Sequence, residues 1–151
     1  MVNLRRITIG GNDYPVKMDI NVIADIQEKY GTYEKFQRDV FGMQYVLDDS
    51  GEIRKDEDGN ALMRRVEPSA RAVAFALPLM INEGLQIEAD EMRKSFEPVR
   101  SVDLFASWDM DYIKAAELIW EEIFDCFGRS DADEDDEDNP KNAQRAKRKS
   151  R

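Results

Sequence analysis

The stretch YPVKMDINVIADIQEKYGTYEKF, residues 14–36, decides what kind of fold the chain forms. It begins as the end of a strand and continues as a helix with one apolar stripe, formed by Ile20, Ile23, Ile26 and Tyr30. Asp19 or Asn21 can cap this helix, because either side-chain oxygen can accept an unpaired backbone N–H. Gly31 is a natural left-handed stop, and Thr32 can cap a second helix. We therefore predict two consecutive helices whose apolar stripes are core.

The residues before this stretch favour a β-hairpin over residues 4–18. Leu4 to Ile9 has a weak strand pattern, and Tyr14 to Met18 is a second short strand segment. Pro15 suits an edge strand or the start of a strand. Between the two segments lie two glycines, an asparagine and an aspartate, which tolerate the positive φ that tight hairpin turns need.

The chain after the second helix indicates an insertion followed by helices. Residues 43–66 contain two acidic turn sequences between short apolar segments, which predicts an exposed hairpin or a mobile loop. A helix then begins near Pro68; we expect Pro78 to kink it or to end its first half, and Gly84 to close it. Residues 88–96 read as a separate short helix.

The longest helix is predicted over Leu104 to Phe127, with Ser101 or Asp103 as its cap. Two adjacent apolar stripes run along it, so it packs on two sides, or it packs on one side and binds a partner on the other. In the first alternative both stripes are internal core. In the second, one stripe is free to bind a partner. The candidate partner-binding residues are Phe105, Trp108, Tyr112, Ile113, Trp120, Phe124 and Phe127.

The last residues differ in character from the rest. Residues 129–151 are acidic and then basic, with no apolar side chain larger than alanine, which is typical of disorder. The predicted architecture is therefore mainly α: a small helical domain over residues 1–128, with an N-terminal hairpin, an inserted second hairpin and a disordered charged tail.

Composition excludes several functions. A net charge of −10 argues against binding to nucleic acid or to an anionic membrane. The absence of histidine removes the commonest general base and metal ligand, so we predict no enzyme, no cofactor and no metal site. An EF-hand loop centred on Gly59 fails, because its first and last ligands would be Arg54 and Arg65. Cys126, the single cysteine, is predicted to be a core thiol. No secretory signal or membrane span is visible, which favours a soluble cytoplasmic protein.

Two regions resemble the tail assembly chaperones of long-tailed bacteriophages. The first runs from Tyr14 to Phe36, where a hairpin leads into an isoleucine-striped helix that ends in Glu28, Lys29, Tyr30 and Gly31. The second is Arg71 to Glu91, a hydrophobic helix followed by a polar stop and an acidic segment. The resemblance covers about two-thirds of the chain, up to Phe127, and residues 43–66 depart from the more compact members of the family.

The resemblance implies a non-enzymatic role in the host cytoplasm. Such chaperones bind the tape-measure protein, keep its apolar helices soluble and help to recruit tail-tube proteins. The oligomeric state stays open, with a homo-oligomer as one alternative. The rival hypothesis is an acidic regulatory protein that imitates nucleic acid and binds a basic protein partner.

Overall fold

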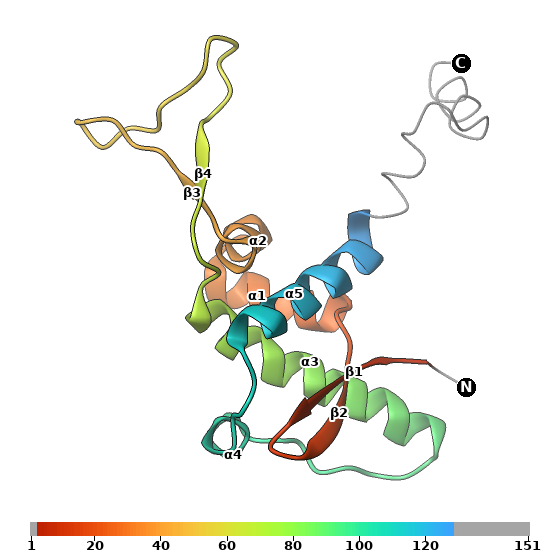
Figure 1. Ribbon diagram of the computed structural model, residues 1–151. Helices are drawn as coiled ribbons and strands as arrows, with labels where there is room; N and C mark the ends of the chain where they lie inside the picture. Colours follow the sequence, from red (N-terminus) through yellow and green to blue (C-terminus); the bar gives the residue numbers. More distant parts are fainter. Residues whose placement is uncertain (1–2, 129–151) are drawn as a thin grey trace, which may run out of the picture.

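The computed structural model describes residues 3–128, which form a helical body and two β-hairpins (Figure 1). The elements in chain order are β1 (Arg5–Ile9), β2 (Asn12–Val16), α1 (Ile20–Tyr30), α2 (Tyr33–Phe41), β3 (Met43–Tyr45), β4 (Met63–Arg65), α3 (Ala70–Glu91), α4 (Ser101–Ala106), α5 (Tyr112–Ile123) and a short π-helix, η1 (Phe124–Gly128). The predicted class, a mainly helical domain with an N-terminal and an inserted hairpin, is confirmed. The predicted disordered tail, residues 129–151, lies outside the described residues.

The N-terminal hairpin is closed by a two-residue turn. Strands β1 and β2 pair antiparallel up to Ile9 and Asn12, which leaves Gly10 and Gly11 as the two turn residues. Both have positive φ, 59° and 82°, a conformation that glycine adopts without a steric penalty. The β2 strand thus begins two residues earlier than the sequence predicts. Ile7, Ile9 and Val16 are buried, so one face of the hairpin belongs to the core.

Helices α1 and α2 begin and end where the sequence predicts. The Asp19 carboxylate accepts the N–H groups of Asn21 and Val22, at 3.1 and 3.3 Å, and Gly31 ends α1 with a φ of 84°. The Thr32 hydroxyl accepts the N–H of Lys35 at 3.3 Å at the start of α2. For one residue of the predicted core stripe, Ile20, the prediction of burial is wrong. Ile20 is exposed, because it is the first residue of α1 and lies outside the packed stripe.

Helix α3 is the longest helix of the described chain and contradicts three predictions. It runs through both Pro78 and Gly84 to Glu91, so Pro78 does not end its first half, Gly84 does not close it, and residues 88–96 are no separate helix. Nine of its residues are buried, Pro78 among them. Burial on this scale offsets the roughly 3 kcal/mol that an internal proline costs a helix.

Gly84 has a packing role instead of a terminating one. A Cβ atom at this position would lie 2.7 Å from the carbonyl carbon and oxygen of Pro15, so only glycine lets β2 approach α3 this closely. Just beyond β2, the N–H of Lys17 donates to the carbonyl of Met80 at 3.1 Å. The hairpin is therefore fastened to the middle of α3.

The helix predicted over Leu104 to Phe127 is wrong as a single element. Residues 107–111 interrupt it, because the Asp111 carboxylate accepts the N–H of Ile113 at 2.9 Å and caps a new helix, α5. The break is also held by the hairpin turn: Asp109 accepts the N–H of Gly10 at 2.9 Å, and Ser107 lies where a Cβ on Gly10 would sit. Neither predicted cap, Ser101 nor Asp103, caps α4 with its side chain.

The core joins every element except the inserted hairpin and η1. Its buried side chains come from the N-terminal hairpin, α1, α2, α3, α4 and α5, and no residue of 43–66 belongs to it. Figure 1 shows residues 43–66, which we call the arm, projecting away from the helical body. The fold thus has a packed body and an arm that contributes nothing to its core.

Candidate partner-binding surface

The seven predicted partner-binding residues fall into two separate groups. Phe105, Trp108 and Tyr112 lie against the start of α3, whereas Trp120, Phe124 and Phe127 lie on the side of α2. Ile113 is half-buried and belongs to neither group. The seven residues therefore do not share one helix, because the chain is broken between α4 and α5 at residues 107–111.

The first group lines a shallow apolar groove of about 280 Å³. Its floor is formed by small residues at the start of α3, and its wall by aromatic rings; the lining residues are Ala70, Val73, Ala74, Phe105, Trp108 and Tyr112. The rings of Phe105 and Trp108 lie 5.7 Å apart at an angle of 56°. The groove has room for one apolar side chain of a partner.

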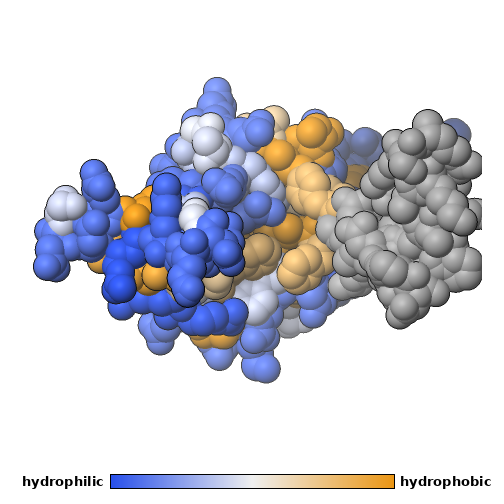
Figure 2. Space-filling view, turned by 90° about the horizontal axis from the view of Figure 1, so that it is seen from above, coloured by the Kyte–Doolittle hydropathy of each residue, from blue (hydrophilic) through white to orange (hydrophobic). Residues whose placement is uncertain are grey.

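The second group joins two aromatic residues of α2 to form what we call the aromatic patch: Tyr33, Phe41, Trp120, Phe124 and Phe127. Phe41 stacks on Phe124 at 5.7 Å and meets Trp120 edge-on at 5.8 Å, and Tyr33 lies 5.4 Å from Phe127. Phe124 and Phe127 remain 44% and 41% exposed. Figure 2 looks down on the side from which the arm projects and shows apolar surface gathered between the arm and the end of α5.

Trp120 holds this patch in place. Its indole N–H donates to the carbonyl of Val40, one of the last carbonyls of α2, which have no partner within the helix. Two more carbonyls at this end are bonded too: Arg38 accepts the N–H of Gly42 at 3.0 Å, and Asp39 accepts those of Gly42 and Ser69, the latter at 2.9 Å. The patch therefore rests on a fixed helix end, and its rings are positioned before any partner arrives.

Tyr33 leaves one polar atom unsatisfied under the patch. Its hydroxyl is buried and has no hydrogen-bond partner within the described residues. Burial, and to a smaller extent the nearby Cys126, raises the pKa of Tyr33 above its ordinary value. A buried hydroxyl without a partner costs about 1–3 kcal/mol, so a group that reached it from outside the described chain would gain that amount.

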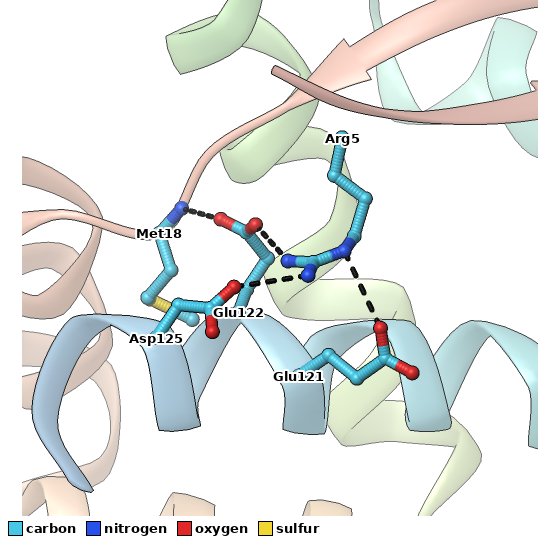
Figure 3. Close-up of polar contacts among 5 residues, drawn as sticks. All are labelled: Arg5, Met18, Glu121, Glu122 and Asp125. Carbon is cyan, nitrogen blue, oxygen red and sulfur yellow. Dashed lines mark hydrogen bonds and ion pairs between the residues drawn. The ribbon is translucent and has the colours of Figure 1, made fainter. Parts of the chain in front are cut away.

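A cluster of charged side chains joins β1 to the end of α5 (Figure 3). The Arg5 guanidinium pairs with Glu122, with Asp125 at 2.9 Å and with Glu121 at 3.4 Å. Glu122 is only 6% exposed, and its other oxygen accepts the N–H of Met18 at 2.8 Å. Both Glu122 oxygens are thus occupied by structural bonds, which makes the cluster a fastening of the hairpin to α5 and not a site with a free base.

Cys126 is exposed, so the prediction of a core thiol is wrong. It lies in η1, where the chain has left the regular α-helical spacing from which the prediction was made. Partial burial raises the pKa of its thiol, with neighbouring carboxylates adding to the effect. Within residues 3–128, no group of three or more acidic or cysteine side chains is placed to hold a metal ion. In the same range, no helix combines the length and apolarity that crossing a bilayer requires.

The sequence did not predict two features: the part that α2 contributes to the aromatic patch, and the apolar residues that the inserted hairpin exposes. In the sequence pattern, Tyr33 and Phe41 appear only as part of the core stripe of α2, because one helix viewed alone does not show which neighbour covers it. The arm carries exposed apolar residues, and its signal, the sequence Asp-x-x-Gly repeated after eight residues, is visible at Asp48 and Asp56.

Comparison with protein-family models, with curated proteins and with solved structures gives no match.

Proposed function

We propose that this protein is a tail assembly chaperone of a long-tailed bacteriophage, which binds the tape-measure protein in the host cytoplasm and helps to recruit tail-tube subunits. The observation that carries the proposal is the aromatic patch. Five aromatic side chains from α2, α5 and η1 gather on one face, and two of them are more than two-fifths exposed. The resemblance of residues 14–36 and 71–91 to that family supplies the identity of the client.

The patch suits an apolar helix as its ligand. Aromatic rings offer a large contact area with few rotatable bonds, and they dominate the energy of protein interfaces. The rings line the junction of two helices, an arrangement that receives the apolar face of an amphipathic helix. A large exposed apolar patch on a small domain also marks an interaction site in general.

Charge adds a second property that a holding chaperone needs. The chain carries a net charge of −10, and exposed carboxylates such as Glu117 and Glu121 follow α5 next to the patch. A complex with an apolar client then keeps a strong net charge, which opposes aggregation. Client helices flanked by lysine or arginine would also meet favourable charges at the rim.

The proposal is tested by co-expression with the tape-measure protein encoded beside this chain. Replacing Phe124 and Phe127 together by serine removes the two most exposed rings of the patch. We expect the affinity for the client, measured by titration of its soluble helical segments, to fall by about tenfold or more. The yield of soluble client should fall with it.

The matched control is the double substitution Ile20→Ser and Met92→Ser, because both residues are exposed, apolar and outside the patch. This variant should hold the client as the unchanged protein does. An equal loss in both variants, or binding that survives without the two rings, would contradict the proposal. An acidic mimic would behave differently: it would bind basic proteins in a salt-dependent way, without regard to Phe124 and Phe127.

A further inference from the structure

The arm is built from an eight-residue repeat. Residues 46–53, VLDDSGEI, and residues 54–61, RKDEDGNA, form the same turn. In the first, the Asp48 carboxylate accepts the N–H groups of Ser50 and Glu52 at 2.8 and 2.9 Å. In the second, Asp56 accepts the N–H groups two and four residues later, both at 2.9 Å. The glycine at the sixth position has a φ of 89° in one turn and 87° in the other.

The two turns meet at a three-way junction of backbone hydrogen bonds. Val46 donates to Leu62 at 3.0 Å, Leu62 donates to Arg54 at 2.9 Å, and Arg54 donates to Val46 at 2.8 Å. The three residues are spaced eight apart, so the first residue of each repeat and the residue after the second repeat bond to one another in a ring. The β3–β4 ladder therefore branches into two short hairpins, closed by the bridges of Leu47 with Ile53 and of Lys55 with Ala61. Local polar bonds, not burial, give the arm its shape.

One face of the arm is apolar and uncovered. Tyr45 is paired with Met63 and Leu47 with Ile53, and paired residues point to the same side of a ladder. Leu47, Ile53 and Met63 are 55%, 41% and 39% exposed, although the arm has a defined structure. No element of the described chain packs on them, because the arm projects from the body (Figure 1).

Charge is unevenly distributed along the arm: its carboxylates lie in the two turns, and its cations lie at the base and, as Arg54 and Lys55, just before the second turn. Arg64 and Arg65 lie at its base, where no described carboxylate pairs with them. The base also opens into a groove of about 570 Å³ that is lined by Arg38, Asp39, Arg64 and residues 43–47; Arg38 is already paired with Glu34, at 3.1 Å. The far ends are acidic, and the turn residues Asp49 and Glu57 have no cationic partner there either. Two such arms laid antiparallel would place each acidic end on a basic base.

We propose that the arm binds a second copy of this chain. The arms of two copies lie antiparallel, apolar face on apolar face, and the acidic turns of each reach the arginine-lined base of the other. Such a contact is self-complementary and closes after two copies, as a two-fold interface does. It covers Leu47, Ile53 and Met63 and pairs the unpaired charges. The inference does not depend on the proposed function, since it concerns a different surface and needs no client.

A charge-swap experiment tests it by sedimentation over a concentration series at low salt. The unchanged protein should reach twice the monomer mass, and added salt should weaken the pairing. Variant A carries Arg64→Glu and Arg65→Glu, and variant B carries Asp49→Lys and Glu57→Lys; Asp48 and Asp56 stay, because they build the turns. Each variant alone should stay monomeric, because in A the base and the ends are both acidic, and in B the ends lose most of the negative charge that would attract the base. An equimolar mixture of A and B should regain the dimer.

The matched control, Lys94→Glu with Lys114→Glu, changes the net charge as variant A does but lies outside the arm, and it should dimerise normally. Circular dichroism checks that each variant is folded. The proposal is overturned if the unchanged protein stays monomeric throughout the series, if it grows beyond two copies, if A and B dimerise alone, or if their mixture does not dimerise. Replacing Leu47 and Ile53 by serine should abolish the dimer without any change of charge.

Discussion

The pair of Arg5 and Glu122 shows how much one side chain contributes to joining distant parts of this chain. Glu122 is buried, and without Arg5 its charge would keep only the N–H of Met18 as a partner. A buried carboxylate that loses its cation retains the cost of desolvation. We therefore expect Arg5→Ala to lower the free energy of unfolding by about 2 kcal/mol, measured by chemical denaturation.

Arg6 provides the matched control, because it is the next residue of the same strand. It pairs with Asp13 at 2.5 Å and with Glu88 at 2.7 Å, but these groups are largely exposed. Exposed ion pairs contribute less than about 1 kcal/mol, so Arg6→Ala should cost less than Arg5→Ala. Equal losses for the two arginines would show that burial of Glu122 is not what matters.

Glu83 predicts how stability depends on pH. Its pKa is raised above the ordinary 4.5, mainly by the side-chain hydrogen bond with Asp19 and then by partial burial, with the charge of Asp25 adding to the shift. A carboxyl whose pKa is higher in the folded state favours folding below its unfolded pKa, and this contribution is lost as the pH rises through the folded value. At neutral pH the charged Glu83 therefore opposes folding.

Glu83→Gln removes that charge and keeps an oxygen that can accept from the Asn21 amide, which now lies 3.1 Å away. We expect it to stabilise the protein at neutral pH by less than about 1 kcal/mol, because solvent screens the site. The gain should vanish once the pH falls below the ordinary carboxyl pKa of 4.5. Thermal unfolding across a pH series measures this, with Glu117→Gln as an exposed control. A gain that persists in acid would contradict the assignment.

At the level of elements, the contact between β2 and α3 depends on Gly84. Glycine to alanine at an ordinary helix position gains about 1 kcal/mol. Here the new Cβ would lie 2.7 Å from backbone atoms of Pro15, which cannot move without shifting the hairpin. We expect Gly84→Ala to lose about 1–3 kcal/mol despite its better helix propensity. Amide hydrogen exchange in β2 should become faster at the same time.

Gln86→Ala is the control in the same helix, since Gln86 is exposed. It should change the free energy of unfolding by no more than about 0.5 kcal/mol. If Gly84→Ala stabilised the protein instead, the close approach of hairpin and helix would not be a constraint in solution.

The same elements show which parts of the fold the sequence can predict. The ends of α1 and α2 depend on Asp19, Gly31 and Thr32, whose partners lie within four residues, so local rules suffice. The length of α3 does not follow from local rules. Glycine disfavours an isolated helix, but here Gly84 is needed because the backbone of Pro15 packs directly against it. The break before α5 is partly held by Gly10, 99 positions from Asp109, and no periodicity reveals such a contact.

For the whole molecule, some residues of the candidate surface could be predicted from the sequence, but which residues lie together on that surface could not. The aromatic residues of α5 and η1 were identified from their spacing, whereas their neighbours Tyr33 and Phe41 join them only through the packing of α2 on this end of the chain. Helix packing also separates Phe105 and Trp108 from that patch. A partner surface that spans several helices is a property of the tertiary structure, and the sequence of one helix shows only some of its residues.

The division into body and arm makes a final prediction about the whole chain. Gly42 accepts the N–H of Val66 at 2.8 Å, so the ends of the arm are adjacent, and a two-residue turn can replace residues 44–65. The core contains no arm residue, so the deletion should move the Tm by less than about 5 °C, equivalent to about 1 kcal/mol. The Tm of the unchanged protein should rise with protein concentration, because pairing stabilises only the folded state, and that of the deletion variant should not. Client binding through the aromatic patch should survive in the variant. A deletion that unfolded the body would mean that the arm supports the core, and a Tm that still rose with concentration would place the contact between copies on the body.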